Sequence, residues 1–248
     1  MTALILALAA GAVIGLTLGA LGGGGSVLAV PALIYLLGFT PMAATTAGLV
    51  IVALTSSVAL TGHARDRHVR WGAGLLFAAA GIGPAMLGSA LASNIPAPAL
   101  QAAFALVAAG AAIRMLRPGQ EKEATPATRP GRAAAAGAGL GAVTGVLGVG
   151  GGFLAVPALV GILGLRMRDA VGTSLLVITV NSLAALALRG GTINALDWAV
   201  VAPFAGAAVL GAWDGRRLSS KVRGHTLQRI FALALLAVAA VMLVDAVV

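Results

Sequence analysis

The chain reads Gly22-Gly23-Gly24-Gly25-Ser26-Val27-Leu28-Ala29-Val30-Pro31-Ala32-Leu33 near its start, where a run of glycines interrupts one apolar segment and begins another. The pattern returns as Gly148-Val149-Gly150-Gly151-Gly152-Phe153-Leu154-Ala155-Val156-Pro157-Ala158-Leu159, which lies 126 residues further on when counted from Pro31 to Pro157. Trp71 and Trp198 are related by a similar offset. Repetition at a nearly constant offset indicates internal duplication, so the sequence predicts two related halves.

The composition places the chain in a lipid bilayer. Of its 248 residues, 60% are hydrophobic and only 9% are charged, which is far from the average of soluble domains. Uninterrupted apolar stretches such as 71–92 and 227–248 reach the roughly 20 residues that a membrane-spanning helix needs. No Lys or Arg precedes the first apolar run, so we interpret it as a first helix rather than a signal peptide.

Ten apolar segments are predicted, five in each half. They run over 2–21, 26–39, 42–61, 71–92 and 98–116, and then over 133–149, 152–164, 170–188, 196–213 and 227–248. The sequence therefore predicts an all-α polytopic membrane protein of about ten transmembrane helices, in two inverted five-helix repeats with Gly-rich broken helices. Its parts are a first membrane repeat (1–116), a polar, cytoplasmic linker (117–132) and a second membrane repeat (133–248), which together form one integral membrane domain.

The distribution of basic residues favours inverted halves. If every segment crosses, 15 of the 16 Lys and Arg residues fall on one side, and only Arg189 lies opposite, which agrees with the positive-inside rule. The alternative treats the short segments 26–39 and 152–164 as re-entrant, which makes the repeats parallel and puts the basic loop 214–225 outside. We favour ten helices with both termini outside, and whether the two short segments span fully stays open.

The two glycine runs are the first candidate site. Consecutive glycines do not favour helix, so N–H groups are left free at the start of the following helix, where the helix dipole is positive and binds anions. Ser26 is placed as an N-cap or as a hydroxyl donor to a ligand. The alternative is that small residues simply allow close helix packing. The candidate substrate-binding residues here are Gly22, Gly23, Gly24, Gly25, Ser26, Gly150, Gly151 and Gly152.

Uncharged polar residues on the third segment of each half form a second candidate group. Hydroxyl and amide groups can donate hydrogen bonds to an oxyanion without a fixed countercharge that would trap it. Their alternative role is hydrogen bonding between helices or to their own backbone. The residues are Thr46, Ser56, Thr173, Ser174 and Asn181.

Several other functions are disfavoured by the composition. The chain has no cysteine and only three scattered histidines, so we expect no metal and no cofactor. The net charge of +9 comes from loops between apolar segments, so we expect no nucleic-acid partner. No charged residue falls near the middle of a predicted span, which argues for a small anionic substrate rather than a cation. The lack of membrane-embedded acid, base or nucleophile argues against an enzyme. A homo-oligomer stays an open alternative.

The repeated glycine run followed by Val-Pro-Ala-Leu, together with Ala170-Val171-Gly172-Thr173-Ser174-Leu175 and the total length, resembles the sulfite exporter TauE/SafE family of membrane permeases. The resemblance implies a permease of the bacterial inner membrane that moves sulfite, sulfonates or other organic anions, coupled to a proton or ion gradient. The first half departs from this pattern, with Ala44-Thr45-Thr46-Ala47-Gly48-Leu49 at the matching place. An anion channel and a membrane assembly protein are the alternatives. The particular anion, the direction and the coupling ion stay open.

Overall fold

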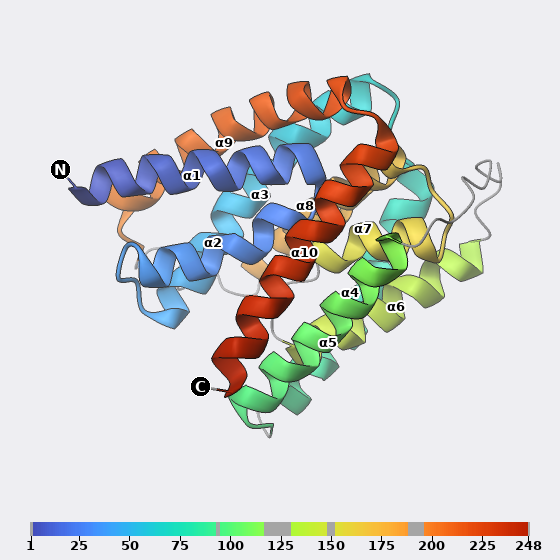
Figure 1. Ribbon diagram of the computed structural model, residues 1–248, viewed down its shortest axis with the longest axis horizontal. Helices are drawn as coiled ribbons and strands as arrows, with labels where there is room; N and C mark the ends of the chain where they lie inside the picture. Colours follow the sequence, from blue (N-terminus) through green and yellow to red (C-terminus); the bar gives the residue numbers. More distant parts are fainter. Residues whose placement is uncertain (1, 93–94, 117–129, 148–151, 188–195, 248) are drawn as a thin grey trace.

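The protein is described by a computed structural model over residues 2–92, 95–116, 130–147, 152–187 and 196–247 (Figure 1). Within these ranges the regular structure consists of ten α-helices, one for each predicted apolar segment. The first half contains α1 (Thr2–Leu21), α2 (Gly24–Tyr35), α3 (Pro41–Arg65), α4 (Trp71–Ala92) and α5 (Ala97–Leu116). The second half contains α6 (Pro130–Leu147), α7 (Gly152–Gly161), α8 (Met167–Ala187), α9 (Trp198–Lys221) and α10 (Gly224–Val247).

One predicted boundary is wrong because charge was taken as the mark of a loop. The expected loop 214–225 is mostly helical, since α9 continues to Lys221 and only Val222 and Arg223 separate it from α10. Asp, Arg, Leu, Ser and Lys are all tolerated in a helix, and no Pro stands in this stretch. α6 begins at Pro130, slightly before the expected segment 133–149, where proline suits the first turn. Residues 117–129 lie outside the described residues.

The starts of α3 and α9 are fixed by local side chains. Thr40 caps α3 by accepting a hydrogen bond from the Ala43 amide at 3.4 Å, and Pro41 follows as the first helical residue. Asp197 caps α9 by accepting one from the Ala199 amide at 3.1 Å. A side-chain acceptor at this position satisfies an amide that has no partner inside the helix. The long third helix of the first half and the long fourth helix of the second therefore begin at defined residues.

The two halves are held together by helix pairs that each contain one helix from either half. α1 of the first half packs along α9 of the second, and α6 of the second half packs along α4 of the first. The contacts are backbone to backbone at glycines: a β-carbon built at Gly15 would collide with the Ala208 backbone, and one built at Gly141 would collide with the Gly81 backbone. Such stripes of small residues let helices approach closely in membranes, where lipid gives no hydrophobic drive to pack.

The helix surfaces suit a lipid environment. Among the described residues, six helical stretches are long and apolar enough to cross a membrane: Met42–Arg65, Trp71–Ala92, Ala99–Leu116, Met167–Ala187, Trp198–Lys221 and Gly224–Val244. Their outward faces carry large apolar side chains, and Leu87, Leu106 and Leu210 are each 70% exposed. Contiguous apolar surface of this kind indicates contact with lipid. The chain is thus a multi-pass membrane protein.

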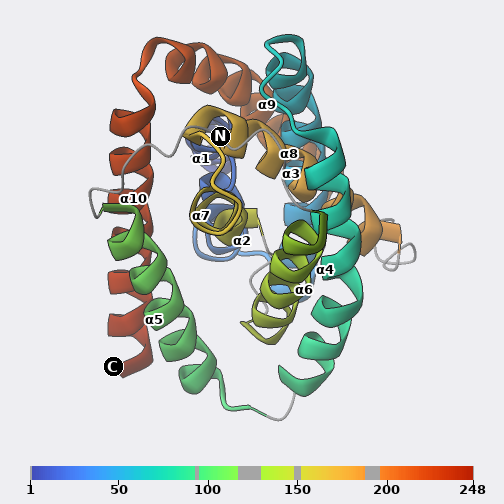
Figure 2. The same cartoon turned by 90° about the vertical axis from the view of Figure 1, so that its right-hand side faces the viewer.

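The short helices α2 and α7 lie near the middle of the molecule. In Figure 2 they are seen between α5 and α10 on one side and α4 and α6 on the other, and they contact each other. With 12 and 10 residues, they are about 18 and 15 Å long, which is roughly half of a 30 Å hydrocarbon core. α7 is buried from Gly152 to Leu159, whereas α2 buries Ala29 and Leu33 and ends at the exposed Tyr35.

Candidate functional site

The first glycine run forms a tight turn between α1 and α2. Gly22 has a φ of +76°, and its amide donates a hydrogen bond to the Leu18 carbonyl at 2.8 Å, which ends α1. A residue with this φ is favoured to be glycine, because a β-carbon would clash with its own backbone. A β-carbon at Gly22 would also lie 2.5 Å from Ser174 Oγ. This position therefore requires glycine for two independent reasons.

The two glycine runs touch each other through their backbones. A β-carbon built at Gly23 would collide with the carbonyl oxygen of Gly152 and lie 2.5 Å from Phe153 Cα. Gly23 is the N-cap of α2, with no side-chain cap, and Gly152 is the first residue of α7. The starts of the two short helices thus meet, and backbone atoms fill the space between Gly23 and Gly152.

The remaining residues of the predicted glycine site are placed less completely. Gly24, Gly25 and Ser26 form the first turn of α2, so the interpretation of Ser26 as N-cap is wrong: the helix begins two residues before it. The reason is that glycine tolerates the helical conformation here well enough for α2 to start immediately after the turn. The side chain of Ser26 is outside the described part of the chain, and so are Gly150 and Gly151.

Ser174 and Thr173 lie on α8 and are fully buried, but they face different neighbours. Ser174 Oγ donates to the Val171 carbonyl at 2.8 Å and lies against Gly22. Thr173 Oγ1 accepts a hydrogen bond from the Arg70 amide at 3.1 Å. Ser174 therefore belongs to the glycine turn, whereas Thr173 ties α8 to the start of α4.

The other predicted polar residues do not gather into one cluster. Ser56 on α3 lies 2.9 Å from Thr179 of α8, measured between the hydroxyl oxygens, and both are buried. Thr46 lies 3.1 Å from the Met42 carbonyl, ten residues and about 15 Å before Ser56 along the same helix. The Oδ1 atom of Asn181 is buried without a hydrogen-bond partner in the described structure. Sequence reasoning missed Thr179, although it stands beside Asn181 and Ser182 in the same polar run.

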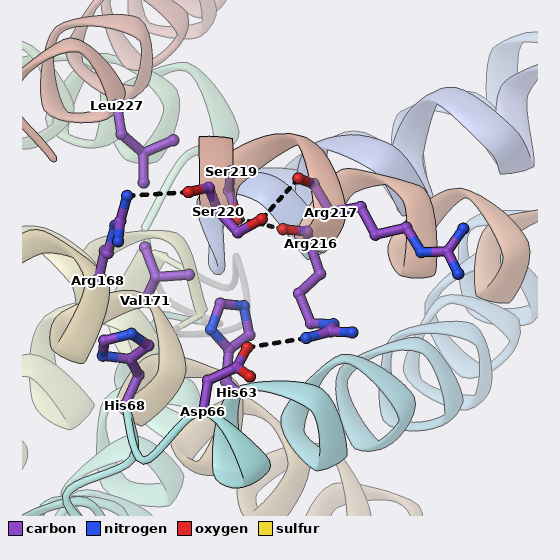
Figure 3. Close-up of a pocket in the computed structure, with 10 residues that line it drawn as sticks. All are labelled: His63, Asp66, His68, Arg168, Val171, Arg216, Arg217, Ser219, Ser220 and Leu227. Carbon is purple, nitrogen blue, oxygen red and sulfur yellow. Dashed lines mark hydrogen bonds and ion pairs between the residues drawn. The ribbon is translucent and has the colours of Figure 1, made fainter. Parts of the chain in front are cut away.

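A polar cavity of about 270 Å³ lies at the end of the molecule where α3 and α9 end and α8 begins (Figure 3). We call it the basic-end cavity. Arginines outnumber acids among its lining residues, which gives it a positive character. They are His63, Asp66, His68, Arg168, Val171, Arg216, Arg217, Ser219, Ser220 and Leu227.

Ion pairs join the chain segments around this cavity. Asp66 and Arg216 pair at 2.8 Å, which links the end of α3 to α9. The buried carboxylate of Asp169, in the first turn of α8, pairs with His68 Nδ1 and with Arg70, both at 3.0 Å. Arg168 donates to the carbonyls of Ser220 and Val222, each at 3.0 Å. The loop after α3, the start of α8 and the end of α9 therefore lie at one end.

His63 is the most enclosed titratable group of this cavity. It is only 6% exposed, and neither ring nitrogen makes a hydrogen bond to the described residues, although the backbone of Gly19 faces the ring. Figure 3 places the ring between Val171 and the guanidinium of Arg216. Buried polar groups usually have partners. The sequence signal was weak, since His63 stands at the end of an apolar run and its neighbours come from distant segments.

The architecture, with six candidate spans, apolar outer faces and two half-length helices, defines a multi-pass helical membrane protein. The family model of the sulfite exporter TauE/SafE matches residues 7–242, and the chain belongs to that family.

Two relatives of known name cover almost the whole chain. A probable membrane transporter protein of Xylella fastidiosa (strain 9a5c) is 34% identical over 244 residues, covering 95% of this chain and 93% of the relative. The corresponding protein of strain Temecula1 / ATCC 700964 is 33% identical with the same coverage. No solved structure matches this chain. These relationships indicate a membrane transporter rather than an enzyme.

Proposed function

We propose that the protein is a secondary transporter of small sulfur-containing or organic anions, such as sulfite or sulfonates, in the bacterial inner membrane. The observation that carries the proposal is the contact between the two glycine runs, where Gly23 touches Gly152 at the starts of α2 and α7. Interrupted helices at corresponding places in two halves are typical of the midplane binding sites of transporters. Family membership and the transporter names of the relatives support the same class.

The chemistry of the proposed site comes from backbone amides. The first N–H groups of a helix have no partner within it, and they point toward the positive end of the helix dipole. The N-cap of α2 is Gly23, which contributes no side-chain acceptor, and in this proposal the amides at the start of α2 bind the oxyanion. Ser174, which lies against Gly22, places a hydroxyl at the same turn and would exchange its hydrogen bond to the Val171 carbonyl for one to the anion. Such donors recognise an anion without a countercharge that would hold it permanently.

We further infer inverted repeats, with α2 and α7 acting as half-length members of ten segments. The exchanged pairing of α1 with α9 and of α6 with α4 is what a two-fold relation between the halves would produce. The re-entrant alternative would put the loop after α3 on the opposite side from the start of α8 and the end of α9. The ion pairs of Asp66 and Asp169 hold these three segments together, which favours the inverted arrangement.

In the proposed mechanism the two halves alternate around the glycine turns. The contact between Gly23 and Gly152 corresponds to a closed state, and separation of the two backbones would open the amides of α2 and α7 to an anion. Coupling to a proton or ion gradient would then determine the direction of anion transport. The linker 117–132 joins the two membrane repeats, 1–116 and 133–248, into one integral membrane domain in this scheme.

The test is transport by the purified protein in liposomes. Radiolabelled sulfite and a panel of sulfonates and carboxylates are followed with and without a pH gradient. We expect saturable flux of at least one anion that responds to a proton or other ion gradient. Flux that rises linearly with concentration and ignores every gradient would instead indicate an anion channel. Folded protein that moves none of the anions would contradict transport and favour an assembly role.

A further inference from the structure

We propose that the basic-end cavity is a second anion site, at which His63 and Arg216 bind a small free oxyanion before it reaches the glycine turns. The proposal rests on the proposed transport function for its choice of ligand, but the site itself is argued from this cavity alone. None of its residues was part of the site predicted from the sequence. The cavity is lined by segments from both halves.

Two side chains of this cavity carry buried nitrogens without a hydrogen bond of good geometry to the described residues, although the backbone of Gly19 faces His63. Both ring nitrogens of His63 and the Nε of Arg216 are buried and make no hydrogen bond within the described structure. A neutral imidazole offers one N–H, and the guanidinium offers an N–H that its ion pair with Asp66 does not use. Buried donors of this kind are normally satisfied, and both line the same cavity. These nitrogens are covered in this conformation, so a ligand oxygen would satisfy them once the lining side chains shift.

The charge and size of the cavity select a small anion. Arg168, Arg216 and Arg217 line it against the single carboxylate of Asp66, so its potential is positive. Its volume of about 270 Å³ equals about nine water molecules at liquid density. A tetrahedral or pyramidal oxyanion with part of its hydration shell fits this space.

The cavity adjoins the glycine turn through one residue. Val171 lines the cavity, and its carbonyl lies 3.3 Å from a β-carbon built at Gly22 while accepting the hydrogen bond of Ser174. The His63 ring is faced by the backbone of Gly19, in the last turn of α1. An anion held by His63 is therefore about one residue layer from the turn at which transport is proposed.

The carboxylate of Asp66 competes with a bound anion for the guanidinium of Arg216. Its carboxylate holds the Arg216 guanidinium at 2.8 Å, so an anion must share or displace it. Loss of the carboxylate would strengthen anion binding, whereas a purely structural ion pair would give no such gain. This opposite sign distinguishes a ligand site from a scaffold.

The chain carries its own reporter for this test. Trp213 lies next to the site, with the guanidinium carbons of Arg216 and Arg217 at 5.5 and 5.7 Å from its ring. The chain has three tryptophans, so replacing Trp71 and Trp198 by Phe leaves Trp213 as the only one. A protein that keeps only Trp198 is the matched control for optical artefacts of the added salt.

The experiment titrates the Trp213-only protein in nonionic detergent with sodium sulfite and sodium methanesulfonate at constant ionic strength set by chloride. We expect a saturable fluorescence change that the Trp198-only protein lacks. His63→Leu and Arg216→Lys should each raise the half-saturating concentration about tenfold, the cost of one hydrogen bond to a charged group. Asp66→Asn should lower it. Arg223→Gln, which removes an exposed charge outside the cavity, should leave it unchanged.

The outcomes separate this proposal from the transport function. An unsaturable response, or one that His63→Leu, Arg216→Lys and Asp66→Asn all leave unchanged, would overturn the cavity site even if liposomes show sulfite flux. Saturation by added phosphatidylglycerol but by neither small anion would also overturn it, in favour of a lipid headgroup. Saturable binding with the expected signs but without flux would keep the site and overturn transport. Arg216→Lys keeps a positive charge that can pair with Asp66. A weaker anion affinity of this variant therefore does not result from unfolding.

Discussion

The glycine runs and the basic-end cavity differ in composition and in symmetry. The turns are duplicated in the sequence, contain almost no side chains and bring backbone into contact with backbone at Gly23 and Gly152. The cavity is made of charged side chains from loops and helix ends of both halves. The duplication does not extend to it. At the offset of 126 that relates Pro31 to Pro157, Arg168 corresponds to Met42, and at the offset of 127 that relates Trp71 to Trp198, His63 corresponds to Gly190 and Arg216 to Ser89.

This difference has a physical meaning for a protein with two related halves. A central element can be two-fold because both halves face the same interior. The two ends face different compartments, so their charge must differ, as the positive-inside rule requires. The duplicated glycine runs thus form the proposed binding region of both halves. The unduplicated charges at one end fix the orientation of the protein in the membrane and attract an anion from one side.

The largest effect is expected where the two glycine turns touch. In Gly23→Val, the new side chain meets the backbone of Gly152 and Phe153, so the starts of α2 and α7 cannot close on each other. We expect sulfite flux in liposomes to fall to the level of empty liposomes. Gly110→Val, where an added β-carbon meets nothing within 4 Å, is the matched control and should keep its flux. Equal flux from both folded variants would contradict a functional role for the contact.

The helix pairs that frame the turns should be the next most sensitive. Gly141 and Gly139 lie two residues apart on α6, but only Gly141 faces the Gly81 backbone, whereas a β-carbon at Gly139 meets nothing within 4 Å. Gly141→Val should lower the free energy of unfolding by about 3 kcal/mol, the upper range for overpacking. Gly139→Val carries the same change in helix propensity without the clash and should be nearly neutral. Denaturant titration in micelles measures both, and similar losses would refute the backbone contact.

Variants at Gly22 can distinguish the cost of a side chain at positive φ from the cost of its contact with Ser174. Gly22→Ala combines a positive φ with an approach to Ser174 Oγ, and we expect a loss of about 2 kcal/mol in unfolding free energy, of which the φ alone contributes about 1–2 kcal/mol. Adding Ser174→Ala removes the crowding but not the φ. The double variant should therefore recover part of the loss relative to the sum of the single changes. Strict additivity of the two effects would show that Ser174 does not press on this turn.

The helices and the glycine turns were largely predictable from the sequence. Apolar length and glycine clusters are local signals, and lipid requires every exposed backbone to be helical, so each predicted segment contains one helix. The errors came from reading charge as loop, as at the end of α9. The contact between Gly23 and Gly152 joins the two duplicated glycine runs. The anion-binding role of the turns stays a prediction.

The polar contacts and the basic-end cavity were not predictable in the same way. Ser56 and Thr173 were selected by residue type, and their partners Thr179 and Arg70 depend on how α3, α4 and α8 pack. Asp169 lies at the start of α8, and its carboxylate is buried against His68 and Arg70, about 100 residues away in the sequence. Pairings of that separation follow from the packing of whole helices, which no local pattern encodes.

The smallest effect is expected at this buried carboxylate. Asp169→Asn keeps the volume but loses the charge that holds His68 and Arg70. Because His68 and Arg70 keep access to water, with side chains 34% and 53% exposed, the loss in unfolding free energy should be only about 1 kcal/mol, near that of a single hydrogen bond. Glycine-turn function would be preserved, so sulfite flux should change little. A loss of flux as complete as that of Gly23→Val, in folded protein, would show that the charged end and the glycine turns move as one unit, and the division drawn between the two regions would fail.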